Sequence, residues 1–109
     1  MTQFAARQGD VLIVATNTIP DGLQPVAREN GRVILAHGEM TGHAHAIDSD
    51  LVTLFAAADL DEMADRFLRV EQECDVVHDE HDTITLPPGD YAIRRQREYT
   101  PEAVRNVAD

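Results

Sequence analysis

The stretch Thr83–Arg95, TITLPPGDYAIRR, decides the fold class of this chain. Its first four residues, Thr83–Leu86, alternate polar and apolar side chains, which is the period of a β-strand with one buried face. Pro87–Gly89 then ends the strand, because proline lacks the N–H that a strand interior donates and glycine permits a tight turn. Apolar residues resume in Tyr91–Arg95, so the stretch predicts two strands joined by a turn.

The same signals recur along the rest of the chain. Short apolar runs rich in β-branched residues alternate with turn residues at intervals of roughly 8 to 12 residues, as in small all-β domains. We expect further strands at Asp10–Ala15, His43–Ile47, Leu51–Ala56, Phe67–Val70 and Cys74–Val77. The sequence therefore predicts an all-β, mainly antiparallel fold, built as a small barrel or sandwich.

Two local signals add detail to this fold. Asn30-Gly31 is the dipeptide that two-residue hairpin turns favour, and it predicts pairing between Pro25–Arg28 and Arg32–Ala36. Thr100-Pro101 combines a helix-capping residue with proline at the first helical position. We therefore expect the segment Tyr99–Val107 to form a short C-terminal helix or an extended tail.

Length and charge limit the classes of function. A chain of 109 residues has the size of one domain, so we expect a single small β domain over residues 1–109. The formal net charge of −11 repels phosphate backbones and argues against general nucleic-acid binding. The lone Cys74 fits a reducing compartment, and we see no signal peptide and no apolar run of membrane-spanning length. We expect a cytoplasmic protein that does not bind membranes.

Histidines are the least random feature of the sequence. His43 and His45 are two residues apart, so on a strand both imidazoles project from the same face. His78 and His81 enclose an acidic pair, which favours a turn and so brings both rings to one side. Upstream, the glycine-containing segment after His37 can fold that residue back toward His43.

This pattern predicts a site for one divalent metal ion. Neutral imidazole is the commonest metal ligand, and Zn²⁺, Fe²⁺, Ni²⁺ or Mn²⁺ accept three imidazoles together with a carboxylate or water. His43 and His45 are the first candidates, followed by His78 or His81 and then His37. The alternative is that these histidines are solvated turn residues or hydrogen-bonded packing residues. Glu39 is the nearest candidate for a general base, although an isolated surface carboxylate explains it as well.

Several sharper motifs are missing from the sequence. The zinc-protease pattern His-Glu-x-x-His does not occur, and one cysteine cannot supply the Pro-Cys-x-x-Cys of zinc deaminases. There is also no phosphate-binding glycine loop and no Gly-x-Ser-x-Gly nucleophile turn. The enzymes and phosphate-binding loops that these four motifs define are therefore excluded.

Arginines concentrate near the end of the chain. Arg94, Arg95 and Arg97 form a group that can hold a carboxylate, a phosphate or a protein partner. On a strand Arg95 and Arg97 share one face and Arg94 takes the other. The competing interpretation is that these arginines neutralise the acidic segments around residues 61–65 and 71–75.

Three stretches carry a resemblance to known proteins: HGEMTGHAHAI at residues 37–47, LPPGDY at residues 86–91 and RQREYTPE at residues 95–102. They resemble a family of short, uncharacterised bacterial proteins, and the resemblance implies no established activity. A looser similarity connects His43-Ala44-His45 to cupins, which are metal-binding β-barrels. Four residues separate Gly38 from His43 where cupins have five, and Ala92 stands where a cupin has its third histidine. Only His43 and His45 match, so a third ligand must come from His37, His78 or His81.

Two functions follow as hypotheses. The first is a metal-binding domain that serves as a small metalloenzyme or as a metal-dependent accessory protein. The alternative is a non-catalytic interaction domain with structural or pH-sensing histidines, whose arginine-rich edge docks a protein partner. A homo-oligomer fits either hypothesis, because strand-rich domains expose edges that pair.

Overall fold

The chain is all-β wherever its structure is described. The computed structural model describes residues 4–37, 43–58 and 65–95. It contains ten strands there and no helix, and so none that is long and apolar enough to cross a membrane. The strands are β1 Ala5–Gln8, β2 Val11–Thr16, β3 Gln24–Pro25, β4 Val33–His37, β5 Ala44–Ile47, β6 Val52–Ala56, β7 Arg66–Val70, β8 Cys74–Val77, β9 Ile84–Leu86 and β10 Gly89–Arg95.

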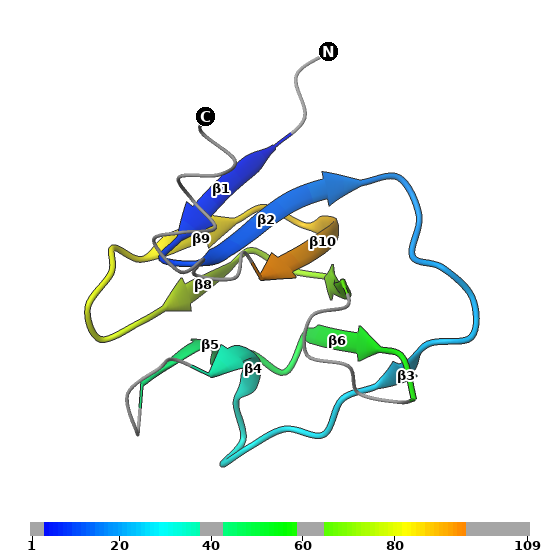
Figure 1. Cartoon of the computed structure of the whole chain (residues 1–109), viewed down its shortest axis with the longest axis horizontal. Coiled ribbons are helices and arrows are strands. Elements are labelled where there is room, and N and C mark those ends of the chain that lie inside the picture. Colours follow the sequence, from blue (N-terminus) through cyan, green and yellow to red (C-terminus); the bar gives the residue numbers. More distant parts are fainter. Residues whose placement is uncertain (1–3, 38–42, 59–64, 96–109) are drawn as a thin grey trace, which may run out of the picture.

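These strands form two antiparallel sheets. One has the order β1-β2-β10-β7-β6-β3 and the other the order β4-β5-β8-β9. In Figure 1 the blue strands β1 and β2 lie beside the orange β10, and β4 lies beside β5. The sheets share a hydrophobic core, so the predicted all-β, sandwich-like fold is confirmed.

The core follows the alternation that the sequence shows. Val11 and Ile13 of β2 are completely buried, and Ile93 of β10 lies directly opposite Ile13 in the register. In the other sheet Cys74 and Val76 of β8 are buried on the same side. Burial raises the pKa of the Cys74 thiol to about 11, so this cysteine is a packing residue and is not a thiolate at neutral pH.

The hairpin at Asn30-Gly31 differs from the prediction. Both residues have positive φ, 55° and 81°, and the flanking Glu29 and Arg32 pair with each other, so the turn itself is present. Its arms then separate: β3 pairs with β6, whereas β4 pairs with β5 in the other sheet. The predicted pairing of Pro25–Arg28 with Arg32–Ala36 is therefore wrong. Val33–Ala36 are all buried, and Val33, Leu35 and Ala36 belong to the core between the sheets. Pairing with the exposed arm before the turn would not give them this burial.

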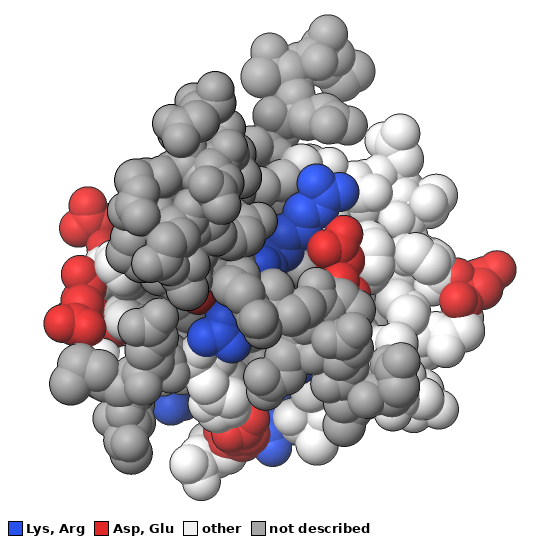
Figure 2. Space-filling model, in the orientation of Figure 1, with Lys and Arg blue, Asp and Glu red and all other residues white. Residues whose placement is uncertain are grey.

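Charged side chains of both signs lie on the face of the molecule that Figure 2 shows. In Figure 2 the coloured acidic side chains lie at several separate positions, and arginines lie between them. Charged side chains of the described residues also form ion pairs, such as Arg69 with Asp90 at 3.2 Å. The C-terminal helix predicted within Tyr99–Val107 lies outside the described residues.

Candidate metal centre

Three segments that are far apart in the chain meet at one place. They are the turn between β1 and β2 at residues 8–10, the start of β5, and the turn between β8 and β9 at residues 78–82. The Gln8 side chain joins the first of these to the third, because its Nε2 donates hydrogen bonds to the carbonyl oxygens of Val76 and Asp82 at 3.0 and 2.9 Å. These bonds tie one sheet to the other beside the histidines.

Four of the five histidines bring their rings together here. The ring centroids of His45 and His78 are 4.5 Å apart, those of His78 and His81 are 4.6 Å apart, and those of His43 and His78 are 5.8 Å apart. The antiparallel register of β5 and β8 explains the closest pair, since its next step sets His45 opposite His78. The predicted turn after β8 then returns His81 to the same group, with its ring nearly parallel to that of His45.

Hydrogen bonds fix the protonation of His45. Only 2% of this residue is exposed, and its Nδ1 lies 2.8 Å from Gln8 Oε1. Because the Gln8 amide nitrogen donates to two carbonyls, its oxygen must be the atom that faces His45, and it can only accept. Nδ1 therefore carries the hydrogen, and in the neutral ring Nε2 carries a lone pair.

The surroundings of His45 favour its neutral form. The pKa of His45 falls from 6.5 to about 4, chiefly because burial disfavours the charged ring and then because His78 lies close to it. Asp10 opposes the shift, while His81 and Arg95 add to it. At neutral pH the ring is thus an uncharged base with one available nitrogen.

That nitrogen faces a carboxylate. His45 Nε2 lies 3.5 Å from Asp10 Oδ1. With Nδ1 protonated, both of these atoms are acceptors, so no hydrogen lies between them. Arg95 holds the other carboxylate oxygen, with Nε donating to Asp10 Oδ2 at 3.1 Å and an Nη donating to the His37 carbonyl oxygen at 2.7 Å. Asp10 is therefore fixed between a guanidinium and an imidazole.

Gly9 makes room for the rings. Its φ of +58° lies in the left-handed region, as the tight turn from β1 to β2 requires. A Cβ at this position would lie only 2.7 Å from His81 Nε2 and 3.4 Å from His45 Cε1. A larger residue would therefore displace the His81 ring.

The outer rim of the cluster is acidic. His43 Nδ1 lies 3.1 Å from Glu80 Oε1, and its Nε2 lies 3.8 Å from Asp79 Oδ2. The backbone N–H of Glu80 donates to His78 Nδ1 at 3.0 Å. The lone pair of His78 is therefore on Nδ1, where it accepts this hydrogen bond inside the turn.

The rings pack against one another instead of directing their nitrogens at one point. Within residues 4–37, 43–58 and 65–95, no group of three or more His, Cys, Asp or Glu side chains is arranged to hold a metal ion. The structure does bring together four imidazoles and the half-buried carboxylate of Asp10, which faces His45. A complete ligand set would require some of these side chains to rotate.

One predicted metal ligand, His37, does not join the cluster. His37 is exposed at the end of β4, and its Nε2 lies 3.0 Å from Glu29 Oε2. The backbone carbonyl oxygen of His37 accepts a hydrogen bond from Arg95, which in turn contacts Asp10 beside the cluster. Glu39, the candidate base, lies outside the described residues.

The arginines divide as the strand alternation predicts. Arg94 is exposed and pairs with Asp65 at 3.1 Å, as the charge-neutralising interpretation expects. Arg95 points to the opposite face and reaches Asp10. Arg97 lies outside the described residues.

A family comparison covers most of this architecture. Residues 7–96 match the family described as "Domain of unknown function (DUF8820)". The chain belongs to this family. The matched span of the DUF8820 domain includes the β1–β2 turn, all five histidines and Arg95. No curated protein and no solved structure gives a match to the chain.

Sequence reasoning missed two residues of the DUF8820 cluster, Gln8 and Asp10. They lie more than thirty positions before His43. The available signal was the run Gln8-Gly9-Asp10 directly before an apolar strand, since a Gly-Asp turn suggests a hairpin. Nothing in the sequence indicates that its polar side chains reach the histidines.

Proposed function

We propose that this DUF8820 domain binds a single divalent transition-metal ion at the histidine cluster, with His45 Nε2 as its anchoring ligand. The bond from His45 Nδ1 to Gln8 Oε1 carries this proposal. Metal-binding histidines almost always donate their second ring N–H to a nearby acceptor, which fixes the tautomer and aims the lone pair. Gln8 provides that acceptor in the buried interior.

Asp10 supports the same proposal. Two ligand atoms that bind zinc at about 2.1 Å, with a tetrahedral angle between them, lie roughly 3.4 Å apart. The separation of His45 Nε2 and Asp10 Oδ1 is 3.5 Å. Two acceptors held this close favour a cation between them, and Arg95 keeps the carboxylate in place.

The remaining ligands would come from the neighbouring rings. His81 and His78 are the nearest candidates, and His43 extends the pair that resembles the His-x-His of cupins. His78 must give up the hydrogen bond from the Glu80 N–H before Nε2 can bind a metal, because that bond holds the ring in the tautomer with its hydrogen on Nε2. Zn²⁺, Fe²⁺, Ni²⁺ and Mn²⁺ are the candidate ions, and the proposal assigns no reaction to the site.

Equilibrium dialysis followed by elemental analysis tests this proposal. We expect the wild-type protein to retain about one equivalent of one of the four ions, and His45→Gln to retain none. His37→Gln is the matched control, because His37 lies apart from the cluster, and it should bind as the wild type does. Equal binding by His45→Gln, or no binding by the wild type, would contradict the proposal and favour histidines with a structural role.

A further inference from the structure

Two arginines occupy inward-facing positions at one end of the larger sheet. In β7 and β10 alternate residues point into the core, as buried Leu68 and Ile93 show. The same alternation continues to Arg66 and Arg95, and the register sets Arg66 opposite Ile93. Arginine is seldom found on the inner face of a sandwich, since burying a guanidinium costs free energy unless an anion or a hydrogen-bond acceptor compensates it.

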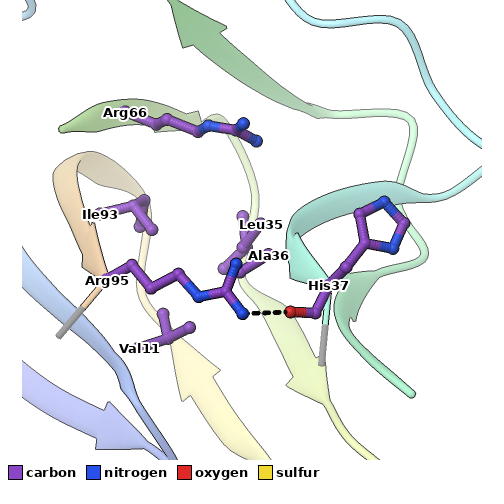
Figure 3. A pocket seen from close by; sticks show the side chains of 7 residues that line it. All are labelled: Val11, Leu35, Ala36, His37, Arg66, Ile93 and Arg95. Carbon is purple, nitrogen blue, oxygen red and sulfur yellow. Dashed lines mark hydrogen bonds between the residues drawn. The ribbon is translucent and has the colours of Figure 1, made fainter. Parts of the chain in front are cut away.

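These arginines line a small hollow with an apolar floor. The floor consists of Val11, Leu35 and Ile93, which are 0 to 4% exposed. The hollow has a volume of about 30 Å³, which suits a compact group and not a drug-sized ligand. Figure 3 shows Arg66 and Arg95 extending in the same direction across it, from neighbouring strands.

One of the two charges is held in place before any ligand arrives. Arg95 donates to Asp10 and to the His37 carbonyl oxygen, so its side chain has little freedom left to lose on binding. Asp10 balances the Arg95 charge, and His37 at the rim pairs with Glu29. Arg66 therefore adds a positive charge at the mouth of an apolar hollow, in a chain with net charge −11.

We infer that this hollow binds the carboxylate end of a small aliphatic acid, with the carboxylate on the Arg66 and Arg95 guanidiniums, the adjoining carbon against the apolar floor and the rest of the alkyl part at the open mouth. Guanidinium groups bind carboxylates through paired hydrogen bonds, and a low-dielectric floor strengthens such contacts. The inference does not depend on the metal site. Asp10 contacts both Arg95, which lines the hollow, and His45 of the cluster, so the two places are connected through this carboxylate.

Titration of the metal-free, ¹⁵N-labelled protein with butyrate, followed by amide chemical shifts, tests the inference. We expect saturable shifts at Val11, Leu35 and Ile93 with a dissociation constant of about 1 mM. Butyramide, which has the same shape without the charge, should produce none. Inorganic phosphate should bind more weakly, because it has no carbon to place against the apolar floor.

Arg66→Gln should weaken butyrate binding at least about tenfold, because the variant loses the charge-assisted bonds. Arg69→Gln is the matched control, since Arg69 lies on the same strand and pairs with Asp90 on the exposed side. If Arg66→Gln does not fold, Arg66→Lys replaces it, and weaker binding is again expected since the ammonium lacks the paired donors. Absence of saturable shifts, unchanged binding in the Arg66 variant, or phosphate binding as tight as butyrate would overturn the inference. Because no metal is present, these outcomes do not bear on the proposed metal site.

Discussion

Replacement of Gln8 by methionine tests the contact on which the site depends. Methionine is similar in length and apolar, so Gln8→Met keeps the buried volume but removes three hydrogen bonds: two to the Val76 and Asp82 carbonyls and one from His45. Each lost bond costs about 1 kcal/mol, and a buried group left without its partner costs about 1–3 kcal/mol. We therefore expect the free energy of unfolding to fall by about 3 kcal/mol or more.

Urea denaturation of the metal-free protein measures this loss, and a thermal scan should show a decrease of roughly 10–15 °C in Tm. The matched control is Gln24→Met, because Gln24 is exposed at a sheet edge. Its unfolding free energy should stay within about 0.5 kcal/mol of the wild type. A Gln8→Met protein as stable as the Gln24→Met protein would refute the assignment of Gln8 as the group that orients His45. Zinc affinity should also fall by about 10- to 100-fold in Gln8→Met, as for other residues that orient a ligand.

Three further outcomes follow from the same geometry. In urea denaturation, the unfolding free energy of Gly9→Ala should fall by about 1–3 kcal/mol more than that of Gly22→Ala, because both have positive φ but only Gly9 has a ring within 4 Å of the new Cβ. Burial lowers the pKa of His45 to about 4 from 6.5. The unfolded chain therefore binds this proton more tightly than the folded protein does. Between pH 6.5 and 4 the unfolding free energy of the metal-free wild type should fall by about 3 kcal/mol more than that of His45→Gln. Equal decreases in the two proteins would contradict this. Free zinc at 100 times its dissociation constant should raise the unfolding free energy by about 2.7 kcal/mol in the wild type, and an equal rise in His45→Gln would contradict the site.

Much of the fold could be predicted from local pattern. The strands β6 to β10 follow runs in which apolar side chains alternate or cluster between turn residues. In such runs the local pattern alone indicates which side chains are buried. The strand β1 was missed because Ala5–Gln8 contains no β-branched or aromatic residue and is held by its pairing with β2. The partner of β4 was predicted wrongly, since which sheet buries Val33–Ala36 depends on the whole core and not on the adjacent turn.

The site divides in the same way. The sequence indicates that His43 and His45 share a face and that the turn at residues 78–81 brings two more rings together, because both depend on local geometry. Gln8 and Asp10 reach the cluster only through the packing of one sheet on the other, which no local signal encodes. Their role also requires the direction of each hydrogen bond, and that is visible only in three dimensions.

The most direct test of the metal site is a long-range ¹H–¹⁵N NMR spectrum of the histidine rings, recorded before and after one equivalent of Zn²⁺. Our account predicts that His45 has a protonated Nδ1 and an unprotonated Nε2 in the metal-free protein. Zinc should then shift the His45 Nε2 resonance and leave the ring of His37 unchanged. A protonated Nε2 on His45 before zinc is added, or a His45 resonance that zinc does not move, would contradict the account.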